Sequence, residues 1–355
     1  MCIRDSSIPD YLAGDTYQSG YFVTANTLGM LSLSGPEDPN FDSYVMDEFA
    51  GGNYDAEEQI AAFYAMIVDK LGDDVTLIAG ARFESTSINY TGQVFDEEED
   101  ELPSDIGSVS GGNDYYNILP NLTLQWDVND ELNLNIAFTQ SIARPSYYDL
   151  VPYEYSNSDD QELALGNPDL KSSLSTNFDF MGEWYFGGLS LLSFGYFSKD
   201  IKDWIYQYTT NNYTYAGVDG YELSQLRNGE KASVSGFELG FQTKFLKNFT
   251  FMGNYTSTDS STNNVEGRDN VPLTGQVDDM YNLSLAFENK KFFVRASMNY
   301  ASEALDELSG DAYEDRYYDE QTFVDVNANY KVNDNLSIFA AVSYTHLRAH
   351  ETLRY

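Results

Sequence analysis

Apolar and polar residues alternate along paired segments of this chain from about residue 53 to residue 344. In NLTLQWDV (121–128), apolar residues occupy every second position and polar residues stand between them, and LNLNIAF (132–138) repeats the pattern after a short polar interruption. A period of two is that of a β-strand with one apolar and one polar face. Two such runs joined by a short turn predict a β-hairpin.

Six such hairpins follow one another, which predicts about twelve antiparallel strands. The first lies at 60–84, and the other five centre on turns at 129–131, 187–188, 246–248, 288–290 and 333–335. The connections between hairpins are much longer than these turns. They include the polar segments 96–114, 146–173, 211–223 and 260–277.

This alternation of short and long connections favours a membrane barrel over a soluble β-sandwich. Tight turns on one rim, long loops on the other and one continuous apolar face are features of outer-membrane barrels. A sheet in hydrocarbon has to close, because lipid offers no partners to backbone groups. The predicted fold is therefore all-β, an antiparallel transmembrane β-barrel. Aromatic residues near strand ends suit its interfacial girdles, with packing in a core as the alternative: Trp126, Trp184, Tyr185, Phe186, Phe245 and Tyr330.

Charge excludes one class of partner. The chain has 57 acidic residues against 19 Lys and Arg, a formal net charge of −38. Nucleic-acid binding needs a basic surface, so we expect no nucleic-acid partner. The acidic run DEEEDE (96–101) could bind Ca²⁺ or bridge to lipopolysaccharide through divalent ions, but it lacks EF-hand spacing, which favours a solvated loop.

Both histidines lie in HLRAH near the C-terminus, where His346 and His350 have the spacing of a helical zinc pair. The glutamate of such motifs is missing, and the alternation stops after Tyr344. The tail 345–355 is basic and helix-like, and with MCIRDS (1–6) it resembles translated sequencing adapters. We therefore expect two artefactual termini around a partial barrel at 7–344, with no metal site and no cofactor.

Enzymatic function is not expected either. A membrane-embedded hydrolase needs a histidine or paired acids in fixed geometry to activate its nucleophile or water. Without the tail the chain has no histidine, so we assign no catalytic residues.

Three motifs occur in order between residues 143 and 205. ARPSYYDLVPY (143–153) opens with Arg-Pro at a strand end, GNPDLKSSLSTNFDFMGEWYF (166–186) carries Gly-Asn-Pro-x-Leu-Lys, and LSFGYFSKDIKDWI (192–205) contains Phe-x-Lys-x-Ile-x-Asp. With NGEKASVSGFELGFQ (228–242) and YNLSLAFENKKFFVRASMNY (281–300), they resemble the C-terminal barrel half of TonB-dependent outer-membrane receptors, over roughly residues 53–343. The motif residues are Arg144, Pro145, Gly166, Asn167 and Pro168.

Physical reasons for these residues are mostly structural. Proline has no N–H for a β-ladder, so Pro145 suits the point where a strand leaves the sheet, and Asn167-Pro168 favours a turn. For Arg144 an ion pair with a carboxylate is favoured over a ligand contact.

The resemblance implies an active transporter in the cell outer membrane of a Gram-negative bacterium. The family's barrel has about 22 strands around an N-terminal plug. This chain would therefore be a fragment that contains about strands 10 to 21, with one more strand expected after them. The plug, the TonB box and the signal peptide would be missing from it. The implied function is uptake of a scarce nutrient, an oligosaccharide or a ferric siderophore. The TonB–ExbB–ExbD complex would supply energy through the missing N-terminal part, and outer-membrane lipid and lipopolysaccharide would surround the barrel. A passive porin or adhesin-like barrel and a soluble β-sandwich lectin are the alternatives.

Tyrosines and acids of the long loops are the candidate ligand contacts. Tyrosine rings stack on sugars or planar siderophore groups, and their hydroxyls form hydrogen bonds with either; packing of the loops on themselves is the alternative reading. The candidates are Tyr147, Tyr148, Tyr153, Tyr155, Asp159, Asp160, Tyr206, Tyr208, Tyr213 and Tyr215. The sequence does not choose between the substrate classes.

Overall fold

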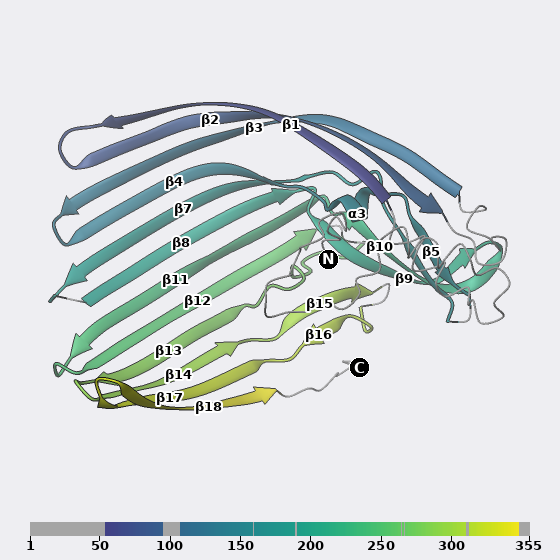
Figure 1. Ribbon diagram of the computed structural model, residues 1–355. Coiled ribbons are helices and arrows are strands. Elements are labelled where there is room, and N and C mark those ends of the chain that lie inside the picture. The colour runs from purple at the N-terminus through teal and green to yellow at the C-terminus, as the bar shows by residue number, and fades with distance from the viewer. Residues whose placement is uncertain are drawn as a thin grey trace, which may run out of the picture.

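The computed structural model describes residues 54–94, 107–158, 160–188, 190–263, 265, 267–309 and 312–347. Twelve of its strands form one curved wall (Figure 1), in which each pairs antiparallel with the next. They are β1 (Tyr54–Lys70), β2 (Val75–Val94), β3 (Gly107–Asn129), β4 (Leu132–Ala143), β7 (Ser173–Phe186), β8 (Ser190–Lys202), β11 (Lys231–Phe245), β12 (Phe249–Asn263), β13 (Asp279–Glu288), β14 (Phe292–Ala301), β17 (Gln321–Asn333) and β18 (Leu336–Leu347).

The wall confirms the six predicted hairpins and their antiparallel order. Tight turns lie at one end of the wall, on the left of Figure 1, and the long connections that the structure describes lie at the other end. Turn chemistry accounts for the sharp reversals: Gly187 and Gly188 have φ of 57° and 89°, a region that glycine enters without a Cβ penalty. Among the described strands, β1 pairs only with β2 and β18 only with β17, so the wall has two free edges and does not close.

Register divides the wall into an apolar and a polar face. One row of directly paired residues crosses eight strands and is almost wholly apolar: Trp184, Leu192, Phe241, Gly253, Leu283, Met298, Val324 and Tyr344. The adjacent row is polar or small: Glu183, Ser193, Gly240, Asn254, Asn282 and Asn299. Because partners opposite each other share a face, the apolar row marks the surface for lipid and the polar row the lumen.

Aromatic residues gather on the apolar face near the tight turns. Ring centroids of Phe249 and Phe287 lie 5.0 Å apart, and those of Phe292 and Tyr330 lie 4.6 Å apart. Trp184 and Phe245 are 45% and 39% exposed, as interfacial side chains would be. Tyr185 does not belong to this girdle. It is out of phase with Trp184, and its hydroxyl donates to Glu183 on the lumen side.

The long connections contain six further strands, which we call the rim sheet. Its strands are β5 (Glu154–Asn157), β6 (Glu162–Leu165), β9 (Ile205–Tyr215), β10 (Val218–Asn228), β15 (Ala304–Ser309) and β16 (Arg316–Tyr318). They pair in the order β5-β6-β10-β9-β15-β16, with β6–β10 and β9–β15 parallel, and they join the wall through a pairing of β5 with β2. The prediction of plain polar loops at 146–173 and 211–223 was therefore wrong.

Two predicted boundaries were also wrong. β3 begins at Gly107 and pairs with β2 as far as Val94, so 107–114 is strand rather than loop. β18 continues through Leu347, paired with Gln321, so no helix begins at residue 345. The proposed artefactual terminus 1–6, the acidic run 96–101 and Asp159 lie outside the described residues. No helix in the described ranges has both the length and the apolar character to cross a bilayer.

Candidate ligand-binding rim

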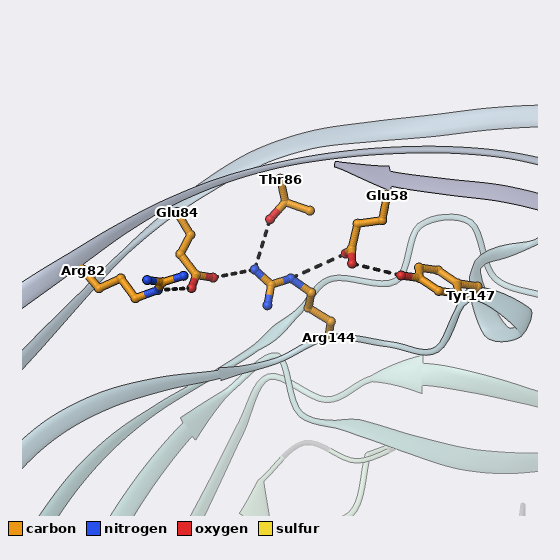
Figure 2. A network of polar contacts seen from close by, with 6 residues as sticks. All are labelled: Glu58, Arg82, Glu84, Thr86, Arg144 and Tyr147. Atoms are coloured by element: carbon orange, nitrogen blue, oxygen red, sulfur yellow. Dashed lines mark hydrogen bonds and ion pairs between the residues drawn. The ribbon is translucent and has the colours of Figure 1, made fainter. Parts of the chain in front are cut away.

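Arg144 is the centre of a polar network on the lumen side of the wall (Figure 2). β4 ends at Ala143, where Pro145 would interrupt the ladder, so Arg144 leaves the sheet and extends toward β1 and β2. Its Nη2 lies 2.6 Å from Glu84 Oε2 and donates to Thr86 Oγ1 at 3.1 Å, and its Nε lies 3.6 Å from Glu58 Oε1. The ion pair expected of this arginine is present.

Two arginines share one carboxylate in this network. Glu84 is only 8% exposed and accepts from both Arg144 and Arg82. The Tyr147 hydroxyl donates to Glu58 at 3.0 Å, and this bond raises the pKa of Tyr147. Burying a carboxylate is costly unless it is paired, so the arginines permit an acid at this position.

The Gly-Asn-Pro motif joins the helix α3 (Tyr147–Leu150) to the rim sheet. Asn167 N donates to Asp149 O at 2.8 Å, and its Nδ2 donates to Leu226 O of β10 at 2.8 Å. Gly166 is needed for close approach, because a Cβ there would lie 1.7 Å from Val151 O. Pro168 follows in the turn that this asparagine closes. The motif thus holds α3 against β10 of the rim sheet.

Three tyrosines form what we call the tyrosine platform: Tyr54, Tyr148 and Tyr153. The rings of Tyr148 and Tyr153 stack with centroids 4.4 Å apart, and Tyr54 lies 6.1 Å from Tyr148. Tyr148 is 39% exposed, whereas burial raises the pKa of Tyr153. Two predicted contacts thus come together, joined by Tyr54, which the sequence analysis missed.

Four further candidates lie farther along the rim sheet. Asp160 accepts from Asn157 Nδ2 at 2.9 Å, and Tyr213 is 37% exposed. Tyr155 is half-buried in β5. Tyr215 donates to Glu154 of β5 and packs edge-on against Tyr221.

Tyr206 and Tyr208 lie instead in the core beneath the rim sheet. They are 5% and 7% exposed and belong to a cluster with Leu305 and Leu308. Trp204 stacks on Tyr206 at 4.6 Å between centroids. For these two tyrosines the structure favours packing of the loops on themselves over contact with a ligand.

A pocket of about 580 Å³, here called the rim pocket, opens beside Arg144. Strand ends of β4, β7 and β8, the start of α3 and the segment 273–276 surround it. Polar residues that line it are Ser141, Arg144, Ser146, Asp149, Ser173, Ser175, Thr274 and Gln276; apolar ones include Pro145, Ile201, Trp204 and Leu273. Sequence analysis missed the serines and Gln276. The position of Ser141 and Ser175 on the polar face, next to the Arg-Pro motif, was the available signal.

Other arginines of the rim face carboxylates or, in the case of Arg227, an aromatic ring, with its Cζ 4.7 Å from the Tyr208 ring centroid. Arg268 forms a two-pronged pair with Asp315 at 2.9 and 3.2 Å. Arg316 lies 2.8 Å from Asp306 and 2.5 Å from Glu307.

Asp278 allows a prediction on pH. Desolvation and the nearby charges of Asp279, Asp259 and Glu303 raise the pKa of this carboxyl. An acid with a higher pKa folded than unfolded binds more protons when folded, so it lowers stability as pH rises between the two values. Asp278→Asn should therefore stabilise the protein at pH 7, by less than about 1 kcal/mol because solvent screens the site. Urea unfolding at pH 7 and pH 3 checks this. The gain should vanish at pH 3, and a gain that persists there contradicts the charge explanation.

A family model described as "TonB dependent receptor-like, beta-barrel" matches residues 6–343. The chain therefore belongs to the TonB-dependent receptor β-barrel family, as the ordered motifs predicted. No curated protein sequence matches the chain.

Solved structures agree in fold. The ferric-catecholate import receptor Fiu from E. coli K12 superposes with a TM-score of 0.61 at 16% identity, over 82% of this chain and 40% of that receptor. The copper transporter OprC gives 0.60 at 13% identity, over 81% and 42%. The ferric enterobactin receptor PfeA from Pseudomonas aeruginosa gives 0.54 at 16% identity, over 82% and 48%. The chain thus spans less than half the length of these neighbours.

Proposed function

We propose that this chain is part of the barrel of an outer-membrane receptor that captures a scarce nutrient at its rim and imports it with energy from the TonB complex. The observation that carries this proposal is the twelve-strand wall, which has an apolar face, a polar face and, at one end, the long connections that the structure describes. Family membership supports it. Polar side chains and exposed tyrosine rings lie at the end of the wall that carries the long connections, and such groups suit ligand capture.

Capture would use the tyrosine platform and the rim pocket. Tyr147, Tyr148, Asp160 and Tyr213 are exposed and remain proposed contacts. Asn167 would act by holding α3 in place through Asp149, and Arg144 by holding the chain just before Pro145 against β2.

Energy coupling separates this proposal from a passive porin or adhesin-like barrel. The protein of the complete gene should be expressed in a Gram-negative host that lacks competing receptors, with and without TonB. We expect uptake of radiolabelled ligand, from a panel of neutral oligosaccharides and ferric siderophores, to cease without TonB and on addition of a protonophore. Uptake that continues in both conditions would identify a passive pore, and binding without any uptake an adhesin.

Tyr148 provides a test of the platform. Tyr148→Ala should weaken ligand binding about tenfold, since an aromatic contact contributes about 0.5–1.5 kcal/mol beyond its buried area. Tyr185→Ala is the matched control, because Tyr185 is similarly exposed but lies near a tight turn at the opposite end of the wall. Calorimetric titration with the ligand found above measures both. If both variants lose the same affinity for the ligand, or if Tyr148→Ala loses none, the tyrosine platform is not part of the binding site.

A further inference from the structure

We propose that the rim pocket binds an uncharged sugar unit, and hence that the ligand is a neutral oligosaccharide rather than an anionic ferric siderophore. This inference rests on the proposed receptor function and names its substrate class. Its basis is the pairing of the rim arginines, the chemistry of the pocket lining and the position of α3.

Three rim arginines already pair with carboxylates, and a fourth, Arg227, lies over the Tyr208 ring. Arg144 pairs with Glu84 and Glu58, Arg268 with Asp315, and Arg316 with Asp306 and Glu307. An anionic ligand that used one of the three paired arginines would have to displace a carboxylate and leave it unpaired, which is costly for a partly buried acid.

Long-range electrostatics act in the same direction. The chain carries a net charge of −38, and a field of one sign raises the local concentration of opposite charges and repels like ones. A neutral ligand is not repelled by this field and does not have to break an ion pair in order to bind.

The pocket lining suits a polyhydroxylated ring. Ser141, Ser173 and Ser175 supply hydroxyls on the lumen side of β4 and β7, while Asp149 and Gln276 supply a carboxylate and an amide. Ser173 Oγ donates to Asp203 O and Ser175 Oγ donates to Asn177 Oδ1, so each oxygen can still accept from a sugar hydroxyl.

Apolar residues complete the lining. Pro145, Trp204 and Leu273 contribute to it, and the apolar face of a sugar ring packs on such surfaces while its hydroxyls form hydrogen bonds around the edge. The volume of about 580 Å³ falls in the usual range of about 300–1,000 Å³ for small-molecule sites.

Helix α3 connects the pocket to the tyrosine platform. Asp149 lines the pocket and Tyr148 belongs to the platform, and the two are consecutive in one helical turn. A ligand longer than one sugar could therefore occupy the pocket with one ring and stack another on Tyr148. This geometry favours an oligosaccharide over a monosaccharide.

Binding by the protein of the complete gene, purified in detergent, tests the assignment. The probes are an array of neutral and acidic oligosaccharides and, separately, ferric enterobactin as an anionic tris-catecholate. We expect at least one neutral oligosaccharide to bind, and ferric enterobactin and the acidic glycans to bind at least about a hundredfold more weakly. Binding of ferric enterobactin or acidic glycans in preference to every neutral one overturns the proposal, as does the absence of neutral binding.

Variants locate the binding in the pocket. Gln276→Ala and Ser175→Val should each weaken binding of the neutral oligosaccharide about tenfold, the effect of losing one hydrogen bond to a buried ligand. Gln207→Ala is the matched control, because Gln207 is exposed on β9 and bonds to Ser224 outside the pocket. Unchanged affinity in both pocket variants, with each still running as a heat-modifiable band on a gel, overturns the site.

The two proposals fail differently. If ferric enterobactin is taken up with TonB dependence and no neutral sugar binds, the substrate class is wrong and the receptor function stands. If a neutral sugar binds through Gln276 but its uptake ignores TonB, the pocket stands and active transport is wrong.

Discussion

Replacing Arg144 with methionine should lower the free energy of unfolding by about 3 kcal/mol, the cost of removing one partner from a buried ion pair. The loss leaves Glu84, which is 8% exposed, with Arg82 alone, and leaves Glu58 without the guanidinium. Arg144 itself is 22% exposed at its side chain, so water cannot fully replace the pair. Urea unfolding in detergent micelles measures the change.

Arg316→Met is the control for this variant. Arg316 also pairs with two acids but is 61% exposed, and exposed pairs contribute about 0–1 kcal/mol. If the two substitutions cost the same, burial of the Arg144 network does not stabilise the rim as described.

Gly166→Ala is the second substitution with a large expected effect. A Cβ at this position would lie 1.7 Å from Val151 O, a main-chain atom that cannot rotate away. The backbone between α3 and the Gly-Asn-Pro turn would have to move, breaking the bond from Gly166 N to Tyr153 O. We expect a loss of about 2–3 kcal/mol, in the upper range for overpacking. Hydrogen exchange should also rise in Asp149 and Asn167.

Gly195→Ala is the matched control, because the nearest atom to its added Cβ lies at 3.7 Å. This variant should unfold like the parent protein. A Gly166→Ala variant as stable as Gly195→Ala would show that the segment can shift freely, and would remove the reason given for glycine in the motif.

The wall could be predicted because its signals are local. Period-two alternation in β11 and β12 and the Gly187-Gly188 turn specify hairpins without reference to distant residues. Family motifs added the order of the hairpins and the place of Arg144 at a strand end.

The rim sheet could not be predicted in the same way. Its parallel pairings join β6 to β10 and β9 to β15, segments that lie about 60 and 100 residues apart in the chain. Tyr206 and Tyr208 illustrate the difficulty. Tyrosine suits both an exposed ligand contact and a packed core. Tyr206 and Tyr208 are buried because Leu305 and Leu308, from a distant part of the chain, pack against β9. Residues 107–114, rich in Gly and Ser, form a strand because β2 pairs with them along its length.

Lipid exposure along β11 tests the central claim most directly. Spin labels can be placed singly at residues 237–242 by cysteine substitution in the protein of the complete gene, with any other cysteines replaced by serine and the protein in outer membranes. Collisions with oxygen should then be high for labels at Phe237, Leu239 and Phe241, which lie on the apolar face. Collisions with a water-soluble nickel chelate should be high at Glu238, Gly240 and Gln242. A period of two with this phase is the result that the barrel wall predicts, whereas nickel access at all six positions would contradict it.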